Sequence, residues 1–316
     1  MSRSALRSEG ALHDRMPQWP AAPWGYWSVP AVLGLVVAVV LQVNHVAQTD
    51  IFLAINKATE ANPQIWAGLT LLGDTGVLLC VMAPVLVWHP SLWVSVVAAI
   101  PLGGLASVAL KWFFDAPRPA DSLSLADFHI VGSVLRGHSF PSGHTITAFA
   151  AASGVWTCWW VLRAKKAAQD PTPLTPALTH QHDVFSSASQ ERSTAHQING
   201  HAFAAVLVLG AAVLVGISRM AVGAHWPWDI VAGASVGWLA GLNGAYIAHR
   251  WQRVWHTPRS VGLLHGLCCA LSLDLLHRTM EAPAGVFMLW LGVVFSWGGL
   301  CWQIMPMRNP PVSDPN

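Results

Sequence analysis

The chain has 316 residues, of which 53% are hydrophobic and only 10% are charged, and its mean hydropathy is +0.45. A composition this apolar excludes an ordinary soluble domain, and runs of about 20 apolar residues indicate membrane helices. The formal net charge of +2 points to no particular partner, and we expect no nucleic-acid partner. The five cysteines lie in apolar segments without metal-ligand spacing, which favours buried thiols over a metal site.

Eight apolar segments are close to the length that crosses about 30 Å of hydrocarbon. We expect these segments to be helices, because they lack a strand-like alternation and lipid offers backbone groups no other hydrogen-bonding partner. The expected fold is therefore an all-α, polytopic membrane helix bundle. The predicted spans are 27–46, 66–88, 92–114, 143–162, 201–218, 228–248, 260–277 and 284–303.

Three regions are predicted along the chain. Residues 1–26 form a cytoplasmic N-terminal segment, and residues 27–248 form a six-helix core. Residues 249–316 form a C-terminal extension with about two further membrane helices. Within the core, the stretch 163–200 is polar and rich in Pro, Ser, Thr, Gln and His, so we expect a flexible cytoplasmic loop there.

The lysine and arginine residues predict the orientation, because cytoplasmic loops carry an excess of both. An even number of crossings places both termini on the same side of the membrane. We therefore expect a multi-pass inner-membrane protein with both termini in the cytoplasm. The cations assigned to the cytoplasmic side are Arg3, Arg7, Arg15, Arg163, Lys165, Lys166, Arg250, Arg253, Arg259 and Arg308. The opposite side receives Lys57, Arg278 and the cations of three motifs described next.

The first motif places two cations at the end of the third predicted helix. Lys111 lies near that end, and Arg118 follows seven residues later, directly before Pro119. The guanidinium fork of Arg and the point charge of Lys both suit phosphate oxygens. Snorkelling cations at a helix end would give the same pattern, so this motif alone leaves both interpretations open.

The second motif, Pro141-Ser142-Gly143-His144, stands directly before the fourth apolar segment. Ser142 is a natural N-cap, and Gly143 permits a ligand to approach the backbone closely. Free N–H groups and the positive end of the helix dipole at this position favour a bound anion. His144 in the first turn belongs to that anion site or is a histidine near the cap without a role.

The third motif places Arg219 near the end of the fifth predicted helix, with His225 and Asp229 at the start of the sixth. Pro227 fits the first turn of that helix. A His and an Asp four residues apart at such a junction can meet. A carboxylate on one imidazole nitrogen fixes the tautomer and leaves the other nitrogen as a nucleophile. The cations gathered in all three motifs make an incidental pair the weaker interpretation.

Together, the three motifs resemble the pattern of the type 2 phosphatidic acid phosphatase family, whose wider superfamily includes vanadium haloperoxidases. The family pattern reads Lys-x6-Arg-Pro, then Pro-Ser-Gly-His, then Ser-Arg-x5-His-x3-Asp, and every specified position is filled here. The resemblance covers roughly residues 65–248. The long loop after the fourth predicted helix and the two C-terminal helices depart from the family pattern.

The resemblance implies a role for each motif residue. His225 attacks phosphorus and forms a phosphohistidine, and Asp229 orients His225. His144 protonates the leaving oxygen and then activates water. The phosphate oxygens are held by Lys111, Arg118, Arg219, Ser142 and the backbone N–H of Gly143. No metal and no cofactor are expected, because three cations and a helix N-terminus supply the charge stabilisation that phosphoryl transfer needs.

The sequence thus predicts a membrane phosphatase whose partner is a lipid phosphate or lipid diphosphate at the extracytoplasmic face. Undecaprenyl diphosphate, phosphatidic acid, phosphatidylglycerol phosphate and lipid A phosphates all fit, and the motifs do not choose among them. One alternative is a vanadate-dependent haloperoxidase, which the apolar composition disfavours. The other is a non-catalytic lipid-binding or transport protein, which the complete set of motif residues disfavours.

Overall fold

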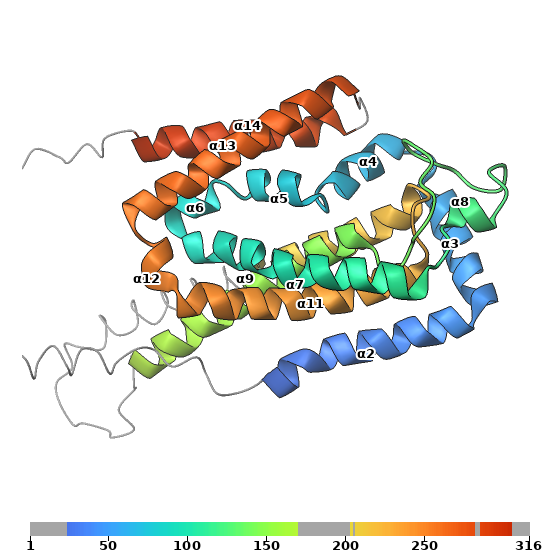
Figure 1. Ribbon diagram of the computed structural model, residues 1–316, viewed down its shortest axis with the longest axis horizontal. Helices are drawn as coiled ribbons and strands as arrows, with labels where there is room; N and C mark the ends of the chain where they lie inside the picture. The colour runs from blue at the N-terminus through green and yellow to red at the C-terminus, as the bar shows by residue number, and fades with distance from the viewer. Residues whose placement is uncertain (1–23, 170–202, 205, 282–284, 305–316) are drawn as a thin grey trace, which may run out of the picture.

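The computed structural model describes residues 24–169, 203–204, 206–281 and 285–304 (Figure 1). Every regular element within these residues is a helix, which confirms the predicted all-α class. The N-terminal helices are α2 (Trp24–Val43), α3 (His45–Thr59), α4 (Pro63–Leu71), α5 (Thr75–Val81) and α6 (Val85–Trp88). The central helices are α7 (Pro90–Phe114), α8 (Pro119–Ser122), α9 (Gly143–Gln169), the unlabelled Val206–Ala221 helix and α11 (Pro227–Arg250). The C-terminal helices are α12 (Gln252–Trp255), α13 (Pro258–Glu281) and α14 (Val286–Ile304).

Five described helices are long and apolar enough to cross a membrane, namely α2, α7, α11, α13 and α14, and the chain is a multi-pass membrane protein. The last two are the C-terminal helices predicted beyond the core. Two other predicted spans, α9 and the Val206–Ala221 helix, are not among the five, and the latter is the shorter element. Helix α9 also continues to Gln169, so the predicted loop at 163–200 begins with helix, and the rest of that loop up to residue 202 lies outside the described residues.

The helix predicted over 66–88 is not continuous, although α4 and α5 taken together are long and apolar enough for a broken membrane span. The segment is divided among α4, α5 and α6, and α4 and α5 are bent by 83° where they meet. Asp74 begins α5 as its N-cap, because its side chain accepts the N–H of Val77 at 3.1 Å. Hydropathy did not reveal this break, because the two helices together are as apolar as a membrane span.

Helix α11 lies at the centre of the bundle and packs against α9, α7 and α2. Close approach depends on glycines along its length. A Cβ on Gly237 would overlap the backbone of Ile146 in α9, and a Cβ on Gly244 would overlap the backbone of Ser95 in α7. Small residues allow membrane helices to approach each other in this way. This packing holds α7 and α9 tightly against α11.

The two ends of the bundle differ in the residues they carry. Helix α3, of which the predicted span 27–46 covers only the first two residues, crosses the end at which α7 finishes and α9 and α11 begin, beside α8 (Figure 1). All three motifs lie at this end. Helix α12 lies at the opposite end (Figure 1), where Arg250, Arg253 and Arg259 follow one another. The predicted cytoplasmic cations Arg3, Arg7, Arg15 and Arg308 lie outside the described residues.

The C-terminal pair α13–α14 packs on itself and against α5 and α4. Leu275 of α13 and Leu289 of α14 form a buried cluster with Val77 and Cys80 of α5. The predicted extension is therefore attached mainly to the broken segment.

Candidate active site

Each motif residue lies at or next to a helix end. Lys111 is in the last turn of α7, and Arg118 directly precedes α8. Ser142 directly precedes α9, and Asp229 lies in the first turn of α11. Arg219 is in the last turn of the Val206–Ala221 helix, and His225 lies in the link from that helix to α11. Gly143 and His144 are the first two residues of α9.

Hydrogen bonds join the three motifs pairwise. Lys111 Nζ donates to the carbonyls of His138 and Pro141, both at 3.2 Å, and so ties the first motif to the second. Arg118 Nη1 donates to the carbonyl of Ala224 at 2.9 Å and ties the first motif to the third. The N–H of Ser142 donates to the carbonyl of Asp229 at 3.0 Å and ties the second motif to the third. The motifs are therefore one site, although the sequence separates them widely.

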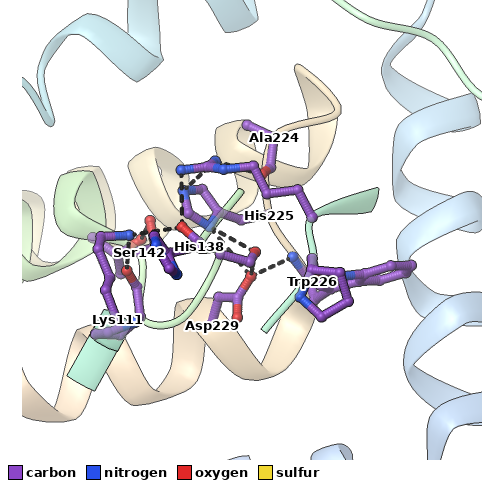
Figure 2. Close-up of polar contacts among 12 residues, drawn as sticks. Lys111, His138, Ser142, Ala224, His225, Trp226 and Asp229 are labelled. Atoms are coloured by element: carbon purple, nitrogen blue, oxygen red, sulfur yellow. Dashed lines mark hydrogen bonds and ion pairs between the residues drawn. The ribbon is translucent and has the colours of Figure 1, made fainter. Parts of the chain in front are cut away.

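The predicted pairing of His225 with Asp229 is present. Asp229 Oδ2 lies 3.2 Å from His225 Nδ1, and both side chains are buried (Figure 2). The same oxygen accepts the backbone N–H of Trp226 at 2.9 Å and the hydroxyl of Ser139. A carboxylate with these donors is fixed in place, and it accepts the proton on Nδ1, which leaves the lone pair on Nε2.

A guanidinium faces the other nitrogen of His225. Arg118 Nη1 lies 3.2 Å from His225 Nε2, on the opposite edge of the ring from Asp229. Burial lowers the pKa of His225 well below its ordinary value, and the positive charges of Arg219 and Arg118 lower that pKa further. His225 is therefore neutral at pH 7, with Nε2 available to a group that takes the place of the guanidinium contact.

The two arginines keep donors without a protein partner. Nε of Arg118 and Nε of Arg219 are both buried, and neither has a hydrogen-bond partner among the described residues. Arg219 is only 5% exposed, and its Nη1 donates to the hydroxyl of Thr70 at the end of α4. Buried cationic donors left unpaired are costly, so these two nitrogens favour a bound anion.

Ser142 occupies the position before α9, as expected for an N-cap, and its carbonyl accepts the N–H of Ile146 at 3.0 Å. Its hydroxyl, however, accepts a hydrogen bond from the hydroxyl of Thr145 at 3.0 Å and, among the described residues, none from a backbone N–H. Ser142 is fully buried. Its backbone thus begins the helix while its side chain is held within the first turn.

His144 and Gly143 line a cavity of about 270 Å³ between α7, α9 and the start of α5. Away from His144, the walls are mostly apolar, and they include Val96, Ala99, Ile146 and Ala150. A second cavity, of about 250 Å³, lies on the side of Arg219 that faces Thr70 and the loop at 130–135. The candidate site therefore has one cavity beside His144 and another beside Arg219.

Residues 92–254, which contain all three motifs, match the PAP2 superfamily. The chain belongs to this superfamily. The family expected from the motifs is thereby confirmed. No curated protein matches the sequence.

Two solved structures are similar to this chain. Aquifex aeolicus LpxE shares 23% identity over 64% of this chain and 94% of its own, with a TM-score of 0.42. The first transmembrane PAP2 type phosphatidylglycerolphosphate phosphatase from Bacillus subtilis shares 17% identity over 72% of this chain and 97% of its own, with a TM-score of 0.44.

Several residues at this PAP2 site were not predicted. Ser139 and Thr70 hold Asp229 and Arg219, respectively, but a lone hydroxyl in a sequence carries no signal of its own. Asn56 of α3 is buried, and its amide donates to the carbonyl of Met220 at 3.1 Å, next to Arg219. Asp74 did carry a signal, because an ionisable residue inside an apolar segment marks a functional candidate.

Two loop residues that precede the second motif have protein partners. Arg136 Nη1 pairs with Asp121 Oδ1 at 2.9 Å and therefore secures the loop to α8. His138 pairs through Nδ1 with Asp115 at 2.7 Å and stacks on Trp112. Its carbonyl accepts from Lys111 and also from Arg118, at 3.4 Å. His138 thus supports both cations of the first motif from the loop.

Proposed function

We propose that this protein hydrolyses the phosphate or diphosphate group of a membrane lipid through a phosphohistidine at His225. The observation that carries the proposal is the position of His225 between Asp229 on Nδ1 and Arg118 on Nε2, each at 3.2 Å. One nitrogen is held by a carboxylate, and the other faces a phosphate-binding cation. That arrangement suits a nucleophile that attacks an anionic centre.

In the proposed first step, the lone pair of His225 Nε2 attacks phosphorus, and the bond from phosphorus to the leaving oxygen breaks. His144 donates a proton to that oxygen. Asp229 stabilises the positive charge that develops on the His225 ring. In the second step, His144 takes a proton from water, the water oxygen attacks phosphorus, the P–N bond breaks, and phosphate leaves. Each step conserves protons, and His144 returns to its starting form.

The charge on the phosphoryl oxygens is assigned to the three cations and to the beginning of α9. The unpaired Nε donors of Arg118 and Arg219 support this assignment, as does the position of Lys111 against the backbone of the second motif. Ser142 and the N–H of Gly143 complete the proposed anion site at a helix N-terminus. Phosphoryl transfer asks mainly for positioning and charge stabilisation, so no metal is required by this scheme.

The cavity beside His144 supports a lipid as the substrate. It runs along apolar residues of α7 and α9, so a hydrocarbon tail can occupy it while the phosphate stays at the helix ends. We place this site at the extracytoplasmic face of the membrane. The proposed substrates include lipid monophosphates and lipid diphosphates. Phosphate release from each type distinguishes them.

The test is release of phosphate by the purified protein in detergent. The substrates are phosphatidic acid, phosphatidylglycerol phosphate, undecaprenyl diphosphate, a lipid A phosphate and a soluble phosphate ester, each with and without EDTA. We expect release from at least one lipid, faster than from the soluble ester, unchanged by EDTA and inhibited by vanadate.

Three outcomes would contradict the proposal in different ways. No release from any lipid would favour a binding or transport protein. Vanadate-dependent halide oxidation without phosphate release would favour a haloperoxidase. A strict Mg²⁺ requirement, restored by adding metal, would overturn the assignment of charge stabilisation to Lys111, Arg118 and Arg219.

A further inference from the structure

The break between α4 and α5 places a carboxylate inside a segment that is otherwise apolar. The link runs through Leu72, Gly73 and Asp74, and the two helices diverge by 83° there. Irregular backbone at membrane depth is tolerated where it is buried in protein or lines a polar cavity. An ionisable side chain in such a place is a functional candidate by default.

The link lies directly against His144. Gly73, Asp74 and His144 line the same cavity of about 270 Å³. A Cβ added to Gly73 would lie 2.6 Å from the Cβ of His144, so only a glycine lets the link approach this closely. Among the described residues, the imidazole of His144 has no direct hydrogen bond. Burial disfavours the charged form of this imidazole most strongly, and the surrounding charges act on top of that effect.

Asp74 is in turn held by the C-terminal extension. Arg278 of α13 pairs through Nη1 with Asp74 Oδ2 at 2.9 Å, and through Nε with Asp274 Oδ2 at 2.9 Å. The other oxygen of Asp74 caps α5. These contacts connect a helix beyond the matched residues 92–254 to the surroundings of His144.

We propose that Asp74 is a positioning residue that keeps His144 in its proton-donating form, and that Arg278 sets how strongly it does so. The proposal rests on the proposed role of His144 as the acid. A general acid that is buried among cations loses its proton easily, and a nearby negative charge opposes that loss. The charged groups that act on His144 are Arg219, Asp74, Arg118 and Arg278, and Asp74 is the one carboxylate of this set. The carboxylate of Asp229 already accepts hydrogen bonds from His225, Ser139 and Trp226.

Two substitutions that break the same ion pair separate this role from a merely structural one. Asp74→Asn keeps the shape and the capping ability of the side chain, because Asn is as good an N-cap as Asp. Arg278→Gln removes the opposing cation and leaves the carboxylate. An electrostatic role predicts effects of opposite sign, whereas a structural bridge predicts the same effect from both.

The measurement is the pH profile of kcat on the best lipid phosphate. The alkaline limb reports loss of the proton from the acid, so it should move to lower pH in Asp74→Asn and to higher pH in Arg278→Gln. A displacement of about one pH unit corresponds to roughly tenfold lower kcat on the alkaline side for Asp74→Asn. Asp127→Asn, an exposed carboxylate on the loop after α8, serves as the matched control and should leave the limb in place.

A second readout does not depend on turnover. NMR of histidine-labelled protein, with His144 assigned by the spectrum of His144→Gln, follows the titration of that imidazole directly. Midpoints that move in opposite directions in the two variants support the role of Asp74, even if no lipid of the panel is hydrolysed. The inference would be overturned if the parent enzyme hydrolyses a lipid phosphate, both variants lose the same fraction of kcat, and the titration midpoint of His144 does not move in either. That result would leave the proposed function intact.

Discussion

Asp229 Oδ2 lies 3.2 Å from Nδ1 of His225, and this buried pair spans the junction at which α11 begins. His225 precedes the helix by two residues, and Asp229 is in its first turn, so one helix start fixes both side chains. Trp226 and Ser139 add two donors to the same carboxylate oxygen. The pair is consequently held in one orientation, in which Nε2 of His225 points toward Arg118.

Removing the proposed nucleophile should abolish turnover. His225→Ala closes the covalent route, and the loss of kcat should span many orders of magnitude. His265→Ala is the matched control, because His265 is also buried but lies on α13 away from the motifs. The measurement is phosphate release together with thermal unfolding of both variants. Activity of His225→Ala within about tenfold of the parent would exclude His225 as the nucleophile.

Removing the proposed acid should give a smaller loss that depends on the leaving group. His144→Ala removes proton transfer, which is typically worth roughly 10² to 10⁴ in rate. An ester whose leaving group needs no proton should be partly spared in single-turnover phosphorylation of the enzyme. Equal losses with activated and ordinary esters would show that His144 does not protonate the leaving oxygen.

The hydroxyl of Ser139 should matter more than that of another buried serine. Ser139→Ala removes a donor to the Asp229 carboxylate, and hydrogen bonds to charged groups contribute about 1.5–3 kcal/mol. We expect kcat to fall by roughly 10- to 150-fold if this energy is expressed in the transition state.

Ser153→Ala provides the comparison for Ser139. Ser153 is equally buried, but its hydroxyl donates to the carbonyls of Ala150 and Trp238. Ser153→Ala should keep its activity within about twofold of the parent. Its free energy of unfolding should fall by about as much as that of Ser139→Ala. Equal effects of the two substitutions on kcat would mean that Ser139 contributes packing only.

The motif end of the bundle should face away from the cytoplasm. A single cysteine placed at 120–135, in a background without the five native cysteines, should react with an impermeant thiol reagent in intact cells. A cysteine placed at 180–190 should not react, because the positive-inside bias predicts that loop to be cytoplasmic. The reverse labelling pattern would overturn the orientation and the extracytoplasmic substrate.

The sequence by itself determined the helical class, the family and the motif residues. The long apolar runs of α2, α7, α11, α13 and α14 are local properties, so a window of about 20 residues detects them. The pairing of His225 with Asp229 was also predictable, because the two residues are only four apart at a helix start. These features involve residues that are close together in the sequence, and helix geometry largely fixes how such residues lie relative to one another.

Only the tertiary structure decided which distant groups support that site. The bend at Asp74, the ion pair of Asp74 with Arg278 and the bonds made by Ser139 and Thr70 depend on how closely the helices pack. The hydropathy of 66–88 is the same for a straight span as for two helices at 83°, so composition could not distinguish them. Asp74 and Arg278 are 204 residues apart, and only the packing of α13 and α14 against α5 brings their charges to 2.9 Å.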